Sequence, residues 1–222
     1  MNTLTSARLA PILARLFELD EASAPLTSPV LIDLSAEERT RRLQSKTEYR
    51  DLYTQLKDFP LAISRATGVL LYMLCRACHA RSIVEFGTSL GVSTLHLAAA
   101  IRDNGGGRLI TSEFETSKAL RARENLAAAG LDDLVEVREG DALETLSVGL
   151  PETVDFLLLD GAKSLYPEIL RLVETRLRPG ALIVADNADH CPEYLTYVRD
   201  TSNRYLTVAF AEDVELTMRI DS

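Results

Sequence analysis

The chain has 222 residues, of which 46% are hydrophobic and 26% charged, so it is long enough for one good core and too short for two typical domains. Its formal net charge of -9 at pH 7 argues against a protein that holds nucleic-acid phosphates on a basic face. We therefore expect no nucleic-acid partner.

The N-terminal residues do not have the pattern of a secretory signal peptide. Arg8, Pro11, Arg15 and Glu18 interrupt the apolar positions, and no apolar run elsewhere approaches the ~20 residues that a membrane-spanning helix needs. We expect a cytoplasmic protein with no membrane partner, whose three cysteines stay reduced.

Two stretches with helical spacing come first, at residues 4–19 and 35–58. Ser35 and Glu38 form a capping box, which predicts that the second helix begins there. That helix carries basic side chains interleaved with acidic ones, a pattern more typical of a solvated helix face than of a binding patch.

The segment Cys75-Arg76-Ala77-Cys78-His79 spells the attachment motif of a c-type haem. Haem attachment of this kind belongs to exported proteins, and the surrounding residues 68–80 have helical spacing. We favour the interpretation in which the small apolar cysteines fill core positions of a helix.

From Ser82 onward, short strand-like runs alternate with helical stretches, which is the signature of βαβ units on a parallel sheet. The expected strands are residues 82–86, 108–113, 134–139, 154–160 and 181–186, followed by a terminal hairpin of 204–210 and 214–220. The expected helices between them lie near 91–102, 116–129 and 164–177.

This alternation predicts an α/β fold with one main domain. We place that domain, which is expected to bind a cofactor, at residues 59–222. Residues 1–58 are predicted to form a helical extension that shapes a substrate pocket or makes a dimer contact.

The first strand runs directly into the loop Gly87-Thr88-Ser89-Leu90-Gly91-Val92-Ser93 and then into a helix, so a small ligand can approach the backbone closely. The dinucleotide fingerprint G-x-G-x-x-G is absent, and Glu85 just before the loop would repel a pyrophosphate. The same carboxylate suits the amino and sulfonium groups of S-adenosylmethionine. We predict Glu85, Gly87, Thr88 and Ser93 as cofactor contacts.

Acids also follow the next two strands. Glu113 ends the second strand, where an acid can accept hydrogen bonds from ribose hydroxyls, as it does in NAD enzymes too. Asp141 follows the third strand and is expected beside the adenine, with the backbone of Ala142 available to the base edge. Each acid is alternatively a helix N-cap, and it is the ordered set that favours a cofactor site.

Asp160 ends the fourth expected strand, and Asp186 ends the fifth and precedes Asn187. If these strands are neighbours, the three side chains lie roughly 5–10 Å apart at the carboxyl edge of the sheet, where open α/β proteins bind ligands. Two carboxylates and an amide oxygen form a hard set that favours Mg²⁺, Mn²⁺ or Ca²⁺ over Zn²⁺. We predict a divalent-cation site, most simply for magnesium, with Asp160 also facing the cofactor.

Lys163 follows Asp160 by three residues. A lysine that is partly desolvated near a bound cation loses its proton more easily, which suits a general base towards a hydroxyl. The cation would ligate that hydroxyl, whose oxygen then attacks the sulfonium methyl in line. The alternative is an exposed lysine at a helix start, but the surrounding acids favour a catalytic role for Lys163 and Asp160.

Together these residues resemble the class I O-methyltransferases of the caffeoyl-CoA and catechol type, over about residues 60–220. The resemblance is carried by Glu85-x-Gly87-x-x-x-Gly91-x-Ser93, Glu113, Gly140-Asp141-Ala142, Asp160-x-x-Lys163 and Asp186-Asn187. It implies a Rossmann-like sheet of seven strands, mostly parallel with an antiparallel last strand, and helices on both faces. It also implies S-adenosylmethionine as methyl donor, a cation held by Asp160, Asp186 and Asn187, and a homodimer.

The functional prediction is therefore methyl transfer from S-adenosylmethionine to a hydroxyl of a phenol, a catechol or another small natural product. Two alternatives stay open, namely a catalytically silent S-adenosylmethionine-binding module and an NAD-binding oxidoreductase. The acidic balance disfavours an RNA methyltransferase. The motifs do not specify which acceptor is used.

Overall fold

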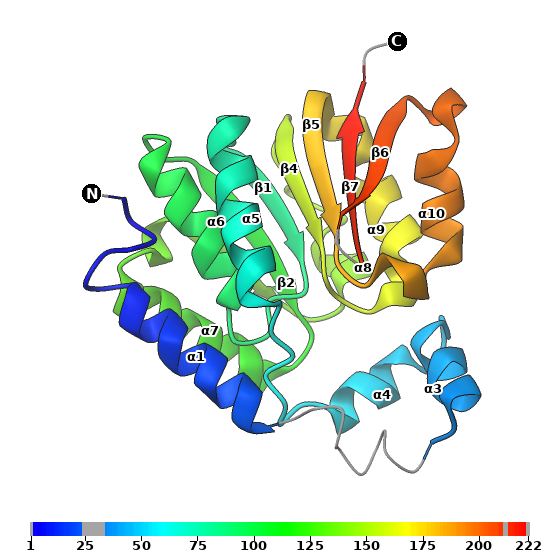
Figure 1. Cartoon of the computed structure of the whole chain (residues 1–222), viewed down its shortest axis with the longest axis horizontal. Helices are drawn as coiled ribbons and strands as arrows, with labels where there is room; N and C mark the ends of the chain where they lie inside the picture. Colours follow the sequence, from blue (N-terminus) through cyan, green and yellow to red (C-terminus); the bar gives the residue numbers. More distant parts are fainter. Residues whose placement is uncertain (1, 24–33, 211–212, 221–222) are drawn as a thin grey trace.

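The computed structural model describes residues 2–23, 34–210 and 213–220 (Figure 1). Seven strands in this part of the chain form one sheet in the order β3-β2-β1-β4-β5-β7-β6. The strands are β1 Ser82–Phe86, β2 Arg108–Glu113, β3 Val135–Glu139, β4 Val154–Leu159, β5 Leu177–Ala185, β6 Tyr205–Phe210 and β7 Val214–Arg219. Only β7 runs against its neighbours, so the predicted sheet with an antiparallel last strand is confirmed.

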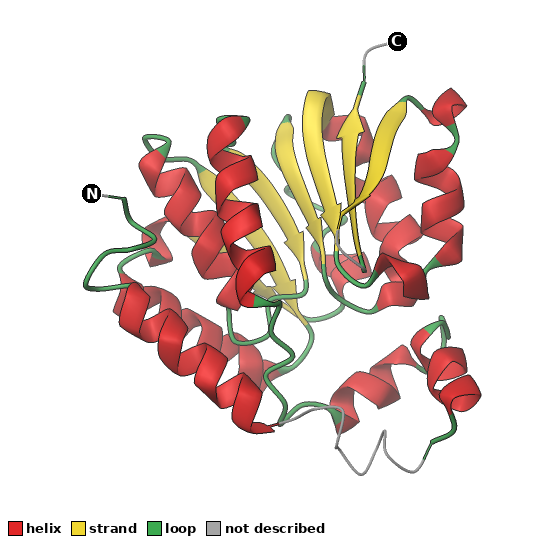
Figure 2. Ribbon diagram, viewed as in Figure 1, coloured by secondary structure: helices red, strands yellow, loops and turns green. Residues whose placement is uncertain are grey.

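Helices cover both faces of this sheet, as predicted (Figure 2). One face packs against α1 Ala10–Ser23, α5 Arg65–Ala77, α6 Val92–Asp103 and α7 Thr116–Ala129. The other face packs against α8 Ala142–Thr145, α9 Tyr166–Val173 and α10 Pro192–Arg199. Each face has its own apolar cluster, so the sheet is the central layer of three.

Strand β4 shows why the runs of apolar residues become central strands. Phe156, Leu157, Leu158 and Leu159 are all fully buried, because side chains that alternate between the two faces meet helices on both. Burying each one stabilises the fold by about 1.5–3 kcal/mol. The chain then leaves the sheet at Asp160, which places a polar side chain at its carboxyl edge.

The first helix begins later than predicted. Helix α1 starts at Ala10 instead of residue 4, because Pro11 lacks an amide hydrogen and is accommodated best in the first helical turn. Leu13 and Leu16 are buried in the same apolar cluster as α5 and α6. The helix therefore packs on the main sheet domain.

The predicted single helix at residues 35–58 is wrong. The chain forms α3 Ala36–Leu43, capped by Ser35 as predicted, and a separate helix α4 Tyr49–Gln55. Between them the Ser45 hydroxyl accepts the backbone N–H of Glu48 (3.1 Å), and a local bond of this kind competes with the helical pattern. Figure 1 shows both short helices beyond the carboxyl ends of the strands, away from α1.

Two boundaries near the fourth and fifth strands also differ from the prediction. Helix α9 is shorter than residues 164–177, since Pro167 lies in its first turn. Strand β5 begins at Leu177 and not at residue 181, and it includes Gly180 with φ +76° next to an irregular register with β4. A glycine in such a conformation is typical of a bulge.

The cysteine pair lies where the core interpretation places it. Helix α5 ends at Ala77, Cys75 is completely buried in the apolar cluster, and Cys78 caps the helix and packs against the same cluster. The haem-like motif is thus explained by packing.

The outer strand β6 presents apolar side chains at its surface. Leu206, Val208 and Phe210 are exposed, as is Met218 of the neighbouring strand.

The expected homodimer and the cytoplasmic location stay predictions. None of the helices described here is long and apolar enough to cross a membrane.

Candidate active site

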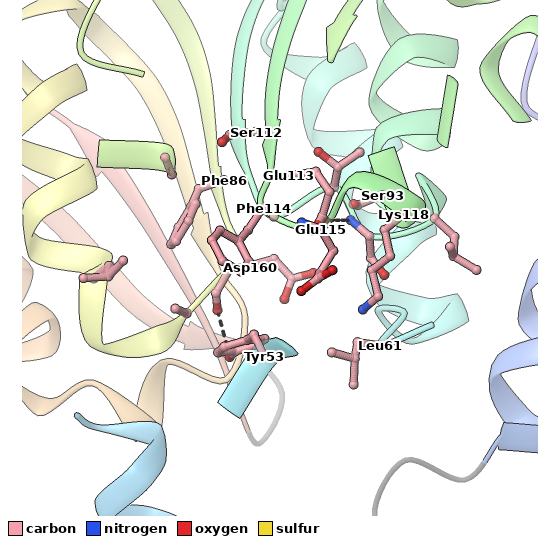
Figure 3. Close-up of a pocket in the computed structure, with 18 of the residues that line it drawn as sticks. Tyr53, Leu61, Phe86, Ser93, Ser112, Glu113, Phe114, Glu115, Lys118 and Asp160 are labelled. Carbon is pink, nitrogen blue, oxygen red and sulfur yellow. Dashed lines mark hydrogen bonds between the residues drawn. The ribbon is translucent and has the colours of Figure 1, made fainter. Parts of the chain in front are cut away.

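A pocket lies at the carboxyl ends of β1, β2 and β4, where open α/β sheets bind ligands (Figure 3). Helix α4 and residues 60–63 form its opposite wall. The empty space in this pocket and its open mouth together amounts to about 880 Å³.

The loop after β1 has the sharp bend that its glycines predicted. Gly87 has φ +102°, and the backbone N–H groups of Gly87 and Thr88 both donate to the Ser112 carbonyl (3.2 Å each). The Thr88 hydroxyl also pairs with that of Thr111 (2.6 Å). Gly87, Thr88 and Ser93 line the pocket, so these three predicted contacts are accessible to a ligand.

Glu85 lies beneath this loop and does not line the pocket. It is completely buried, and its two carboxylate oxygens accept the hydroxyls of Ser93 (2.5 Å) and Thr94 (2.7 Å). Burial raises its pKa to about 6. The structure therefore does not bring Glu85 to the ligand surface as the sequence suggested, although Ser93, which donates to it, does line the pocket.

The raised pKa of Glu85 predicts how the stability of the protein depends on pH. Its pKa is raised above the ordinary 4.5, so its stabilising contribution is complete below about pH 4.5 and is lost as pH rises through about 6. This difference corresponds to about 2 kcal/mol of unfolding free energy. Glu85→Gln has no titrating carboxyl at this position and therefore lacks this pH dependence. When the pH is raised from 4.5 to 7.5, the unfolding free energy of the variant should increase by about 2 kcal/mol relative to that of wild type. Urea unfolding at both pH values measures this, and two parallel pH profiles would contradict it.

Glu113 projects from the end of β2 into the pocket, as predicted. Its two oxygens accept the backbone N–H groups of Ser89 (2.7 Å) and Glu115 (2.8 Å), which hold the carboxylate in one orientation. Burial raises its pKa. Each carboxylate oxygen has a further lone pair, so the group can still accept hydrogen bonds from a diol.

Asp141 is a helix N-cap, the alternative considered from the sequence, and it also reaches the pocket, whereas its contact with the adenine stays a prediction. One oxygen caps α8 by accepting the Leu143 N–H (2.9 Å), while the side chain also lines the pocket beside buried Ala142. The other oxygen accepts the Tyr49 hydroxyl (3.1 Å) and pairs with Arg50. Partial burial opposes ionisation, but these hydrogen bonds together lower the pKa of Asp141.

Helix α4 supplies lining residues that the sequence analysis missed. Tyr49, Arg50 and Tyr53 all face the pocket, and the Tyr53 hydroxyl donates to the Gly161 carbonyl (3.4 Å). Arg50 is solvated, as expected for this helix face, since 54% of its side chain is exposed, but it also pairs with Asp141 at the pocket. The available signal was the pair of tyrosines four residues apart, which share one face of a helix.

The α3–α4 segment is also fastened to the sheet domain. The Lys46 ammonium bridges Glu168 of α9 and Glu193 of α10 at 2.7 Å each, and the Ser164 hydroxyl donates to the Ser45 carbonyl (3.0 Å). These exposed ion pairs stabilise only weakly. Their geometry nevertheless holds the segment over the edge of the pocket.

Asp160, Lys163 and Asp186 lie together at the carboxyl ends of β4 and β5. These strands are neighbours in register, as predicted, since Leu159 pairs with Ala185. Lys163 Nζ is 3.0 Å from Asp160 Oδ1 and 3.9 Å from Asp186 Oδ2. Only 6% of Lys163 is exposed, so the exposed helix-start alternative is wrong.

The charges in this cluster influence one another strongly. Burial and the nearby carboxylate of Asp160 raise the pKa of Asp186 to about 7, and burial also raises that of Asp160. Burial opposes the charge on Lys163, but Tyr166 and Asp160 outweigh it and raise the lysine pKa well above its usual value. The neighbouring acids therefore favour the protonated form of Lys163, and the expectation that a bound cation makes this proton easier to lose stays a prediction.

Asn187 directly follows Asp186 in the chain and has φ +47°. Its side-chain Nδ2 donates to Asp213 Oδ2 (3.0 Å), which leaves its amide oxygen as a ligand atom. Within residues 2–23, 34–210 and 213–220, no three His, Cys, Asp or Glu side chains group in a way that could hold a metal ion. The oxygen-only set of Asp160, Asp186 and Asn187 is the donor set that fits a hard cation.

Known proteins that are similar in sequence to this chain are methyltransferases. The family model of a methyltransferase domain matches residues 84–188. A catechol O-methyltransferase of Niastella koreensis is 37% identical over 130 residues, which are 57% of this chain and 58% of that protein. Catechol O-methyltransferase B of Danio rerio is 30% identical over 187 residues, covering 80% of this chain and 69% of that protein. The chain thus matches less than two thirds of the bacterial relative.

The solved structures agree on the fold. An O-methyltransferase from Bacillus cereus in complex with SAH superposes with a TM-score of 0.68 at 24% identity. The superposition covers 93% of this chain and 100% of that one. At this level of identity the likeness shows the shared fold alone.

Proposed function

Because this chain belongs to the class I S-adenosylmethionine-dependent O-methyltransferase family, we propose that it methylates a hydroxyl group of a small phenol or catechol with the help of a divalent cation. The observation that carries the proposal is the convergence of Asp160, Lys163 and Asp186 beside the pocket. Opposite charges fixed at this place suit the deprotonation of a hydroxyl and the stabilisation of the oxyanion.

The cofactor is assigned along the pocket wall. We place its methionine end at Gly87, Thr88, Ser93 and Asp160, which all line the pocket near the end of β1. We place the ribose at Glu113, whose carboxylate is oriented by two backbone N–H groups.

The adenine is assigned to the far end of the same wall, next to Asp141 and Ala142. Arg50 and Tyr49 already contact Asp141 from α4. If the adenine binds to Asp141, it must therefore share the carboxylate oxygen that Tyr49 and Arg50 already contact, or displace these two side chains.

Methyl transfer is an in-line displacement. The acceptor hydroxyl gives its proton to the uncharged amine of Lys163, its oxygen forms a bond to the methyl carbon, and the C–S bond breaks to release S-adenosylhomocysteine. A divalent cation held by Asp160, Asp186 and Asn187 would supply positive charge that stabilises the oxyanion and offsets the carboxylates that keep Lys163 protonated. Phe86 and Tyr53 line the pocket, and their rings would limit the access of water to the reacting atoms.

The alternatives differ in what they predict. A silent binding module would bind the nucleoside and transfer no methyl group to any acceptor. An NAD-dependent oxidoreductase would need a loop that tolerates a pyrophosphate, and the loop after β1 lacks the middle glycine of that fingerprint, with Ser89 in its place.

Removal of the cation tests the function directly. We expect S-adenosylhomocysteine to bind with or without Mg²⁺, catechol to bind only when Mg²⁺ is present, and chelator to abolish methyl transfer reversibly. Isothermal titration with both ligands, followed by a transfer assay on a panel of phenols and catechols, measures these effects. Transfer that survives chelation would remove the cation from the proposal, and failure to bind the nucleoside would overturn it altogether.

A further inference from the structure

Lys118 is a buried cation in the pocket that the mechanism does not use. It lies in the first turn of α7, only 5% of it is exposed, and it lines the pocket. Figure 3 shows its side chain extending past Glu113 towards Leu61 on the opposite wall. Its ammonium makes no hydrogen bond or ion pair within the part of the chain that the structure describes.

This position is unfavourable for a lysine in the unliganded protein. Burial without a partner opposes its charge and lowers its pKa, and a cation at a helix N-terminus also faces the positive end of the helix dipole. If this position only supported the fold, an apolar residue would be more favourable here than a lysine. The ammonium is therefore available to a ligand.

The surrounding charge indicates what kind of ligand group it meets. Glu113 and Glu115 are the carboxylates that act on Lys118 most strongly. One ammonium beside two carboxylates leaves a negative local charge, which disfavours a phosphate. A sugar hydroxyl fits better, because it both donates and accepts a hydrogen bond.

We infer that Lys118 donates a hydrogen bond to a ribose hydroxyl of the cofactor, opposite the hydrogen bond that Glu113 accepts from the ribose. The inference rests on the proposed function, which places the ribose at Glu113. Glu113 is an acceptor only and its orientation is fixed by Ser89 and Glu115, so Lys118 supplies the donor that the diol otherwise lacks. Lys118 thus acts in cofactor selection and not in the chemical step.

Lys118→Met tests the inference, since it removes the donor and keeps the length of the side chain. We expect S-adenosylhomocysteine to bind the variant roughly tenfold more weakly in isothermal titration, the usual loss for one hydrogen bond to a charged group. Arg121→Met is the matched control, because it removes an exposed cation from the same helix, and its affinity should stay within about twofold of wild type.

Two further measurements separate this role from a structural one. The unfolding midpoint of unliganded Lys118→Met should equal or exceed that of wild type, because an unpaired buried charge is removed. The 2′-deoxy and 3′-deoxy forms of S-adenosylhomocysteine then locate the contact. For one of them the loss caused by Lys118→Met should disappear, since the hydroxyl that receives the bond is missing.

The outcomes are distinct. Equal losses for the parent nucleoside and both deoxy forms would mean that Lys118 only balances the nearby acids, and unchanged affinity would mean that it takes no part in binding; either result overturns the inference while leaving the proposed function in place. Wild-type protein that does not bind S-adenosylhomocysteine would overturn the proposed function and this inference together.

Discussion

Asp160→Ala is expected to lower kcat/KM for methyl transfer by on the order of 10³-fold. The side chain lines the pocket, holds Lys163 at 3.0 Å and is one of the two carboxylates available to a cation. Its loss removes a proposed cation ligand and the group that positions the proposed base. Binding of S-adenosylhomocysteine should weaken much less, because Asp160 is one of several groups along the cofactor wall.

Steady-state kinetics with the best acceptor from the panel, together with nucleoside titration, measures both effects. Asp189→Ala serves as the control, since Asp189 is an exposed acid three residues after Asp186 and contacts only His190 at 3.9 Å among the described residues. A loss in kcat/KM of less than about tenfold for Asp160→Ala, close to that of Asp189→Ala, would remove Asp160 from the catalytic group.

Gly87→Ala is expected to lower the free energy of unfolding by about 3 kcal/mol and to abolish nucleoside binding. Gly87 has φ +102°, and a Cβ atom there would lie 2.5 Å from the Asp160 carbonyl oxygen. The clash is with backbone, so either the loop after β1 or the end of β4 has to move. Both segments contribute residues to the proposed active site.

Gly106→Ala separates the clash from the unusual backbone angle. Gly106 has φ +97°, nearly that of Gly87, but a Cβ atom there would meet nothing within 4 Å. We expect it to cost only about 1 kcal/mol, which is the penalty of the left-handed conformation itself. Urea unfolding of both variants measures the difference, and equal losses would show that the close approach of the loop to Asp160 is unimportant.

The order of the polar residues along the chain was informative because the fold repeats one local unit. Each parallel strand of such a unit ends at the carboxyl edge of the sheet, so a polar residue at or just after the end of a strand emerges there. Glu113, Asp141, Asp160 and Asp186 could therefore be assigned to one edge before any contact was known. The structure places all four there.

Glu85 shows the limit of this reasoning. Its position before the loop suggested a ligand contact, but whether a side chain reaches the pocket or turns beneath the loop depends on what surrounds it. The hydroxyls of Ser93 and Thr94 pair with both of its oxygens. Alternation along a strand does not encode that choice.

The sequence by itself determined the mostly parallel sheet, the glycine loop and the set of acids at the sheet edge, because these depend on local periodicity and on the order of the strands. Only the tertiary structure brought Arg50 to Asp141, buried Lys118 without a partner and surrounded Lys163 with carboxylates that raise its pKa. The physical reason is that side-chain pairing across many tens of residues, and the desolvation that sets pKa values, arise only when separate elements pack together.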